Sequence, residues 1–285
     1  MPMMPTVFVA ALAAALGGVE TRELPLKPPR NGGVYVVAHR GAHQGIPENT
    51  LAAYRKAIEL GCDFVEIDVR TTKDGRFVSV HNSTVDGYVD GVTGRVDEFT
   101  LAELKALDIG SRVGPEWKDE RIPTFEEILD LCNGKIGIYL DLKEAPVEPL
   151  VREIEKRNMQ HSVIWYAGSR ELKQVKALSP ECVIMPDPGP EKNLPPLLKD
   201  LEPRVVATVW RHHTKSLVEM CHEAGAIVIV DEGDVDPKRD VTCWQQALAW
   251  HSDGVQTDYP AEFIAFLKAR EKAAAATPAE GSSIE

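Results

Sequence analysis

From Gly33 onward the chain alternates short apolar runs with amphipathic stretches, and this alternation limits the folds open to it. Short runs rich in Val, Ile, Phe and Tyr are typical of strands, whereas apolar residues at helical spacing are typical of helices. Strands that alternate with helices indicate a parallel sheet. No internal repeat or second domain is visible, and barrels of this length are commonly single domains. We therefore expect an α/β protein with a single (β/α)8 barrel.

Nine runs qualify as strands for eight barrel places, so one of them is not a barrel strand. The strand candidates are Tyr35–Ala38, Phe64–Val69, Phe77–Val80, Ile136–Leu142, Val163–Tyr166, Val183–Met185, Val205–Val209, Ala226–Val230 and Gly254–Thr257. The helix candidates are Thr50–Leu60, Leu101–Leu107, Phe125–Leu131, Val147–Arg157, Arg170–Leu178, Thr214–Ala224 and Thr242–His251. The Pro-containing stretch Glu191–Asp200 is interpreted as a linker.

Two helices carry recognisable end signals. Thr50, or Asn49 before it, is a suitable N-cap for the first helix, and Gly61 is a suitable C-terminal stop. Thr100 and Glu103 have the spacing of a capping box at the start of a later helix.

The charge balance narrows the range of partners. The 44 acidic residues outnumber the 32 basic ones, which gives a formal net charge of −12. Such a surface argues against non-specific binding of nucleic acid or anionic membranes. It leaves an anionic small molecule open as substrate, because a bound metal reverses the charge of a site locally. The odd number of cysteines, five without CxxC spacing, indicates buried thiols rather than a disulfide framework.

The two ends of the chain differ from its middle. An apolar segment, Thr6–Gly18, is too short to span a bilayer and resembles the core of a secretory signal, although Met1–Pro5 lacks a basic residue. We interpret residues 1–30 as a signal peptide or another N-terminal extension, 31–270 as the barrel domain and 271–285 as a disordered tail. With a signal peptide the protein is periplasmic or secreted, and otherwise it is cytoplasmic.

Two acids interrupt an apolar strand. Glu66 and Asp68 lie on the same face of Phe64–Val69, because strand side chains alternate. Two buried carboxylates repel each other and are expensive to desolvate, and a divalent cation compensates for both effects. A solvated edge strand is the structural alternative.

The same pattern recurs at other strand ends. Polar side chains follow the apolar part of three more strand candidates, in His39-Arg40-Gly41, His81-Asn82 and Asp141-Leu142-Lys143. In a barrel enzyme the catalytic groups collect at this C-terminal end of the strands. A metal ion, an arginine and a lysine neutralise a phosphodiester in its transition state, and two histidines are suited to proton transfer.

At these residues the chain resembles the glycerophosphodiester phosphodiesterase family. The matching segments are His39-Arg40-Gly41, Pro47-Glu48-Asn49-Thr50, Gly61–Val69, Thr72-Lys73-Asp74-Gly75, His81, Ile122-Pro123-Thr124, Asp141-Leu142-Lys143 and Gly254–Pro260. The resemblance runs from about His39 to Pro260 and is carried by the ordered set rather than by any one motif.

The resemblance implies a (β/α)8 TIM barrel with a small insertion after the third strand, which Ser83–Arg121 would supply. It implies His39 and His81 as acid and base, in an order that it leaves open. One divalent cation, Mg²⁺ or Ca²⁺, would be bound by Glu66, Asp68 and Asp141, and the phosphate would be held by Arg40 and Lys143.

Three positions depart from the family pattern. Asn82 stands where the family usually has Asp, which removes a charge beside His81. Asp141 replaces the usual Glu, as in the related sphingomyelinase D-like enzymes. Val230-Asp231-Glu232 replaces a common Val-Trp-Thr, which removes an aromatic wall and adds two acids that would disfavour an anionic head group or bind another cation.

The function expected is metal-dependent hydrolysis of a glycerophosphodiester or a similar small phosphodiester. The alternatives are a lyase-like enzyme that converts a phospholipid to a cyclic phosphate, and a barrel that binds a phosphorylated ligand without catalysis. Two nearby residues are not assigned to the predicted site. His43 is interpreted as a solvated loop residue, and Glu48 either enters the mouth of the barrel or only stabilises the N-terminus of the helix that follows.

Overall fold

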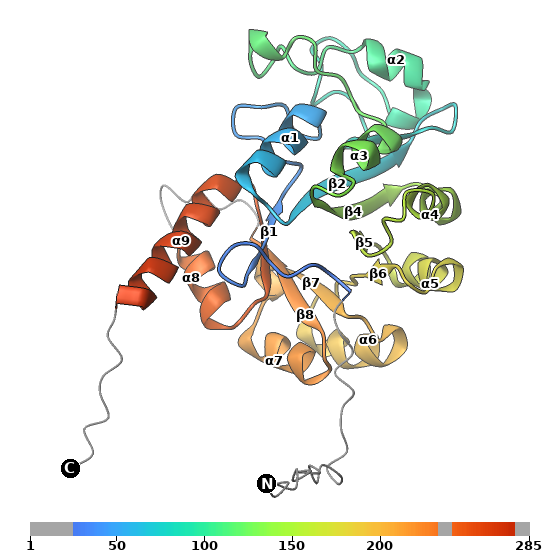
Figure 1. Ribbon diagram of the computed structural model, residues 1–285. Coiled ribbons are helices and arrows are strands. Elements are labelled where there is room, and N and C mark those ends of the chain that lie inside the picture. Colours follow the sequence, from blue (N-terminus) through green and yellow to red (C-terminus); the bar gives the residue numbers. More distant parts are fainter. Residues whose placement is uncertain (1–24, 233–240, 277–285) are drawn as a thin grey trace, which may run out of the picture.

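The computed structural model describes residues 25–232 and 241–276 of the chain. Eight parallel strands form a nearly closed barrel with helices around it (Figure 1), so the predicted (β/α)8 fold is confirmed. The strands are β1 Tyr35–Ala38, β2 Phe64–Thr71, β3 Phe77–Ser79, β4 Gly137–Glu144, β5 Val163–Tyr166, β6 Val183–Ile184, β7 Val205–Val209, β8 Ile227–Asp231 and β9 Gly254–Thr257. The helices are α1 Leu51–Leu60, α2 Leu101–Ala106, α3 Phe125–Cys132, α4 Val147–Glu155, α5 Ser169–Leu178, α6 Leu194–Leu201, α7 Lys215–Glu223, α8 Thr242–Ala249 and α9 Pro260–Ala276.

The barrel strands follow one another around the ring in the order β6-β5-β4-β2-β1-β9-β8-β7. The two ends of this row meet where the Ala207 N–H donates to the Pro186 carbonyl, at 3.0 Å. Strand β2 therefore lies diametrically opposite β7, with β6 and β8 as the two neighbours of β7. Residues at the upper ends of β2 and β7 therefore face each other across the barrel.

Alternation along the strands separates two apolar layers. Every second residue of a strand points into the barrel. These inward residues form the inner layer, which contains Tyr35, Val37, Phe64, Tyr139, Ile164, Val183, Met185, Val205, Ala207 and Ile229. The intervening residues, such as Val65 and Leu140, pack outward against the helices. Because the inner layer is apolar in the lower part of the barrel, only the upper positions of each strand are open to polar groups.

The predicted helix ends are confirmed where an N-cap or a capping box was expected. The Thr50 side chain accepts from the Ala53 N–H and caps α1, which Gly61 ends in a left-handed conformation. Thr100 and Glu103 form the predicted capping box of α2.

The extra strand candidate is Phe77–Val80, which is not a barrel strand. Strand β2 extends past the rim of the barrel, and β3 turns back antiparallel along it, with Val69 opposite Ser79 and Thr71 opposite Phe77. The expectation that His81 ends a barrel strand is therefore wrong. The chain after β3 nevertheless returns to the mouth of the barrel, where the Val80 N–H donates to the Asp68 carbonyl at 2.9 Å.

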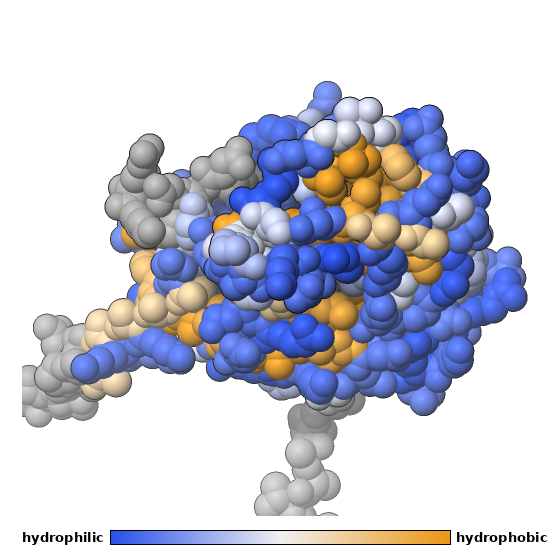
Figure 2. Space-filling model, turned by 90° about the horizontal axis from the view of Figure 1, so that it is seen from above, coloured by the Kyte–Doolittle hydropathy of each residue, from blue (hydrophilic) through white to orange (hydrophobic). Residues whose placement is uncertain are grey.

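The insertion after β3 has a small core of its own. This core is made of Val78, Val80, Val85, Val96, Leu104, Ile109 and Ile122. The insertion projects at the top of Figure 1, beyond α1 and α3. Seen from that side, the surface is mostly hydrophilic (Figure 2), and of the large apolar side chains in the described part only Val113 and Leu178 are exposed.

Two segments that were predicted to be irregular contain helix. The expected linker Glu191–Asp200 contains most of helix α6, because Pro195 and Pro196 occupy its first turn, where proline is tolerated. Helix α9 continues to Ala276, so the first residues of the expected tail are helical. Residues 277–285 lie outside the described chain.

The expected signal peptide lies mainly in residues 1–24, outside the described chain. The described part starts to pack earlier than the boundary at residue 31, since Leu26 joins the inner barrel core and the Arg30 N–H donates to Asp63 Oδ1 at 2.9 Å. No described helix combines the length and the apolar character needed to cross a membrane. All five cysteines lie buried in the described chain, and none of them forms a disulfide there, as predicted.

Candidate active site

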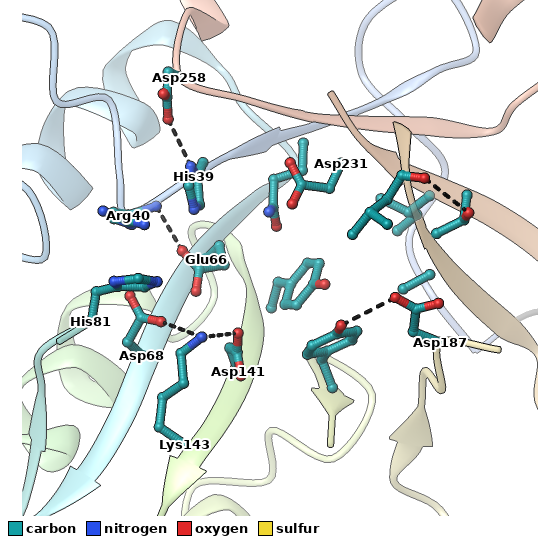
Figure 3. A pocket seen from close by; sticks show the side chains of 17 residues that line it. His39, Arg40, Glu66, Asp68, His81, Asp141, Lys143, Asp187, Asp231 and Asp258 are labelled. Atoms are coloured by element: carbon teal, nitrogen blue, oxygen red, sulfur yellow. Dashed lines mark hydrogen bonds and ion pairs between the residues drawn. The ribbon is translucent and has the colours of Figure 1, made fainter. Parts of the chain in front are cut away.

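A cavity of about 380 Å³ opens at the C-terminal ends of the barrel strands. All seven predicted site residues line it, and Figure 3 shows them around one space. The seven are His39, Arg40, Glu66, Asp68, His81, Asp141 and Lys143. Four of them lie on β2 and β4, His39 and Arg40 directly follow β1, and His81 comes from the loop after β3.

Three carboxylates converge at the base of this cavity. Glu66, Asp68 and Asp141 each offer an oxygen, and these atoms lie within 4.8 Å of one another. Burial, with the neighbouring Asp68 and Asp141 carboxylates, raises the pKa of Glu66 well above its ordinary value. Burial also raises the pKa of Asp141, against the effect of Lys143.

One ammonium group faces this cluster. Lys143 Nζ lies 2.6 Å from Asp141 Oδ2 and 3.2 Å from Asp68 Oδ1, and Asp68 Oδ1 accepts no hydrogen bond from the described residues. Three carboxylates against one lysine leave negative charge uncompensated, and clustered carboxylate oxygens are the donor set of Mg²⁺ and Ca²⁺. The residues therefore fit the divalent cation that the resemblance implies.

Asn49 fixes the orientation of one of these acids. Its side-chain amide donates to Asp68 Oδ2 at 2.8 Å, and its oxygen accepts from Tyr54 Oη and Ser79 Oγ. The residue adopts a left-handed conformation with φ 53°, which asparagine tolerates better than most residues. It was considered as an N-cap from the sequence, but Thr50 has that role.

The Asn49→Ala variant is expected to bind the divalent cation about 10–100-fold more weakly, because partners that orient metal ligands have effects of this size. Isothermal titration calorimetry with Mg²⁺ and Ca²⁺ measures this change. The exposed Asn158, another left-handed asparagine far along the chain, provides the control variant Asn158→Gly. An unaltered affinity of Asn49→Ala would show that Asp68 needs no help from this amide.

The turn after β1 brings a backbone donor to the cluster. Gly41 has φ 85°, and a Cβ atom there would lie 2.7 Å from the Cβ of Ala53, so only glycine fits. In this turn the Arg40 N–H donates to Glu66 Oε2 at 2.8 Å. The Arg40 guanidinium is bound by both oxygens of Glu48, which places Glu48 at the site rather than only at its helix.

His39 is held by an acid from the other end of the chain. Its Nδ1 lies 2.7 Å from Asp258 Oδ1, which leaves Nε2 for the cavity. His43 Nε2 lies 3.1 Å from the same oxygen. These two contacts outweigh burial and hold the pKa of Asp258 well below its ordinary value. The interpretation of His43 as a solvated loop residue is therefore wrong.

His81 is fixed through its backbone and its ring. Arg70, a buried residue of β2, donates to the His81 carbonyl at 2.7 Å. His81 Nδ1 lies 3.0 Å from Asn82 Oδ1, so the amide that replaces the family's usual Asp still contacts the ring. The absence of a charge at position 82 therefore leaves an acceptor in place for a ring N–H.

The sequence analysis assigned no role to several residues of the cavity. They are Tyr139, Tyr166, Asp187, Thr208, Gln256 and Asp258, and they come from β4 to β7 and from β9 or the loops that follow. Asp187 stands two residues beyond Met185, which packs in the inner core just after β6, and Asp258 stands two residues beyond Gln256 of β9. The alternation that revealed Glu66 and Asp68 would have found both of them.

The two added acids of the altered strand take different positions. Asp231 lines the cavity, whereas Glu232 is buried and accepts a hydrogen bond from Trp244 Nε1. Burial raises the pKa of Glu232 to about 8. Of these two acids, only Asp231 therefore faces the cavity.

Comparison with known proteins agrees with this geometry. Residues 39–183, half of the chain, match the model of the glycerophosphoryl diester phosphodiesterase family. The chain belongs to this family. A glycerophosphodiester phosphodiesterase of Caldanaerobacter subterraneus subsp. tengcongensis is 39% identical over 157 residues, which are 52% of this chain and 64% of the relative. One from Bacillus subtilis is 33% identical over 175 residues, 54% of this chain and 58% of the relative. The aligned part thus spans less than two thirds of either family member.

Solved structures share the whole barrel. A phosphodiesterase of Oleispira antarctica, in complex with the product sn-glycerol-3-phosphate, superposes with a TM-score of 0.72 at 27% identity, over 82% of this chain and 96% of that one. A glycerophosphodiester phosphodiesterase of Agrobacterium tumefaciens has a TM-score of 0.71 over 81% and 99% of the two chains. At 24% identity the second likeness concerns the fold alone.

Proposed function

We propose that this chain hydrolyses glycerophosphodiesters, or similar small phosphodiesters, to an alcohol and a phosphomonoester. The observation that carries the proposal is the convergence of Glu66, Asp68 and Asp141 beside two histidines and two basic residues in one cavity. Membership of the family and the product bound in the Oleispira structure support the substrate class.

The acidic triad would hold one divalent cation, Mg²⁺ or Ca²⁺, which when bound supplies positive charge to a phosphate oxygen. Arg40 and Lys143 add positive charge on the same side of the cavity, where it stabilises the five-coordinate phosphorus. Because Lys143 forms ion pairs with both Asp141 and Asp68, its ammonium already lies beside the acidic triad.

The two histidines would transfer the protons. Asp258 accepts a hydrogen bond from Nδ1–H of His39 and so presents Nε2 to the substrate, either as base or as acid. His81 takes the complementary role, with its ring oriented by Asn82. One histidine removes a proton from the attacking water, and the other donates a proton to the leaving alkoxide, which departs as the alcohol.

The direct test is hydrolysis of a panel of glycerophosphodiesters by the purified protein, with and without EDTA. We expect turnover without EDTA, its loss after chelation and its return when Mg²⁺ or Ca²⁺ is added in excess. Activity that survives complete removal of divalent cations contradicts the metal role. Binding without turnover across the panel would favour the non-catalytic barrel.

A cyclic phosphate is the second candidate product, favoured by one observation. The third acid of the cluster is Asp141, and the sphingomyelinase D-like enzymes also have an aspartate at this place. The ³¹P NMR spectrum of the products distinguishes the two outcomes, because a cyclic phosphodiester and a phosphomonoester have different chemical shifts. We expect the monoester.

A further inference from the structure

The chain that carries His81 leaves the sheet before it reaches the cavity. Strand β3 ends at Ser79, and the N–H of the next residue, Val80, donates to the Asp68 carbonyl at 2.9 Å. The carbonyl groups of Val80 and His81 accept no backbone hydrogen bond from the described residues. Because buried carbonyl groups are almost always hydrogen-bonded, we expect a side chain to bind these two.

Arg70 supplies the donors for both carbonyl groups. It follows Asp68 by two residues on β2, and its side chain is buried. Its Nε donates to the Val80 carbonyl at 3.0 Å and to the His81 carbonyl at 3.2 Å, and its Nη2 donates to the His81 carbonyl at 2.7 Å. Hydrogen bonds from a charged donor are stronger than those between neutral groups, and the planar guanidinium also fixes their direction.

Glu144 holds the other side of this guanidinium. Arg70 Nη1 donates to Glu144 Oε2 at 2.7 Å, and Arg95 of the insertion approaches the same oxygen at 3.4 Å. Glu144 is the last residue of β4, directly after Lys143, and it lies opposite Arg70 in the pairing of β2 with β4. The two strands that carry the acidic triad therefore also fix the guanidinium.

The other contacts near His81 do not make this connection. The His81 ring contacts Asn82 Oδ1, and the Asn82 N–H donates to the Tyr88 hydroxyl at 3.2 Å. These contacts orient the ring and attach the loop to the insertion. Past the end of β3, the described hydrogen bonds that attach the loop to the strands of the acidic triad are those of the Val80 N–H and of Arg70.

We propose that Arg70 is a positioning residue that fixes the place of His81 relative to the acidic triad, and through it the rate of the proton transfer assigned to His81. The inference rests on the proposed function, in which His81 exchanges a proton with the substrate or the attacking water. A displacement of about 1 Å at a reacting group lowers the rate by about 10²-fold. A loosened loop therefore lowers turnover although every reacting group is still present.

The test is steady-state kinetics of Arg70→Gln on a glycerophosphodiester. We expect kcat to fall by about 10–100-fold, whereas KM and the cation affinity measured by calorimetry stay close to those of the wild type. Arg70→Lys should recover only part of the loss, because an ammonium group lacks the planar fork that binds two carbonyl groups and a carboxylate together.

A double-mutant cycle separates this role from general support of the fold. In a His81→Ala background, Arg70→Gln should have no further effect on kcat, because its effect acts through the missing ring. A residue that only stabilises the fold would lower kcat by the same factor in both backgrounds. Unfolding temperatures show which variants are folded.

Arg76→Gln is the matched control, because Arg76 is a half-exposed arginine of the same hairpin that pairs with Glu126. It should have wild-type kinetics. Glu144→Ala changes a half-exposed residue and removes the carboxylate that binds Arg70. It should lower kcat in the same way as Arg70→Gln but less, again without effect in the His81→Ala background.

Two results overturn the inference and leave the proposed function standing. One is wild-type kcat in Arg70→Gln, or in Glu144→Ala if Arg70→Gln does not fold. The other is an equal loss of kcat with and without the His81 ring. If the wild type hydrolyses no diester, the proposed function fails and the inference with it.

Discussion

Replacing His39 or His81 with alanine lowers kcat for glycerophosphodiester hydrolysis by about 10²–10⁴-fold, the range expected for loss of a general acid or base. His39 is bound through Nδ1 to Asp258, and His81 through Nδ1 to Asn82, so each ring has one nitrogen left for a substrate. Steady-state kinetics on a reactive glycerophosphodiester measures the change. We expect KM to change much less than kcat, because neither ring holds the metal cluster together.

The control for both variants is His161→Ala, which removes an exposed histidine at the opposite end of the barrel. Cation binding by calorimetry should match the wild type in all three proteins. If His39→Ala and His81→Ala retained wild-type turnover, the proton transfers would have to come from other groups and the proposed mechanism would be wrong.

The Glu66→Gln variant loses the divalent cation and gains stability in its absence. Glutamine keeps the shape of the side chain and the acceptor for the Arg40 N–H, but it removes one of three buried charges. We expect cation affinity to fall at least about 100-fold and hydrolysis to fall with it. Calorimetry and kinetics test these effects.

The stability change has a definite pH dependence. The pKa of Glu66 is raised in the folded protein, so this group lowers the stability of the fold progressively as the pH rises above its unfolded value, 4.5 for a free glutamate, where the unfolded chain loses the proton first. In metal-free buffer the unfolding temperature of Glu66→Gln should therefore exceed that of the wild type at pH 7. The difference should disappear near pH 4, where both states of the wild type are protonated. A variant less stable than the wild type at pH 7 would mean that the carboxylate stabilises the fold.

Much of the site was predictable from alternation along the strands. His39, Glu66, Asp68 and Asp141 each occupy an inward position just above the apolar layer of the barrel. The same rule would have identified Asp187, but β6 spans only two residues, and so short a strand carries little sequence pattern. The prediction therefore worked best where the strand itself was long.

Other features depend on contacts between distant residues. His43 and Asp258 are 215 residues apart, and nothing in the loop around His43 indicates its partner. His81 was placed correctly at the cavity although its strand was misassigned, because the hairpin returns the chain to the rim. The sequence predicts a linker in place of helix α6 because the segment contains Pro195 and Pro196. Proline is tolerated in a helix only in the first turn, and the start of α6 is not marked clearly enough in the sequence to show that both prolines lie there.

The hairpin that carries His81 has a consequence for how such a site evolves. The acidic triad and His39 belong to the barrel, whereas His81 is supported by β3, Arg70 and the core of the insertion. One of the two groups proposed for proton transfer therefore lies on a separate structural unit. Substitutions inside the insertion can shift His81 relative to a substrate, or change the width of the cavity entrance, while the positions of the three carboxylates stay the same.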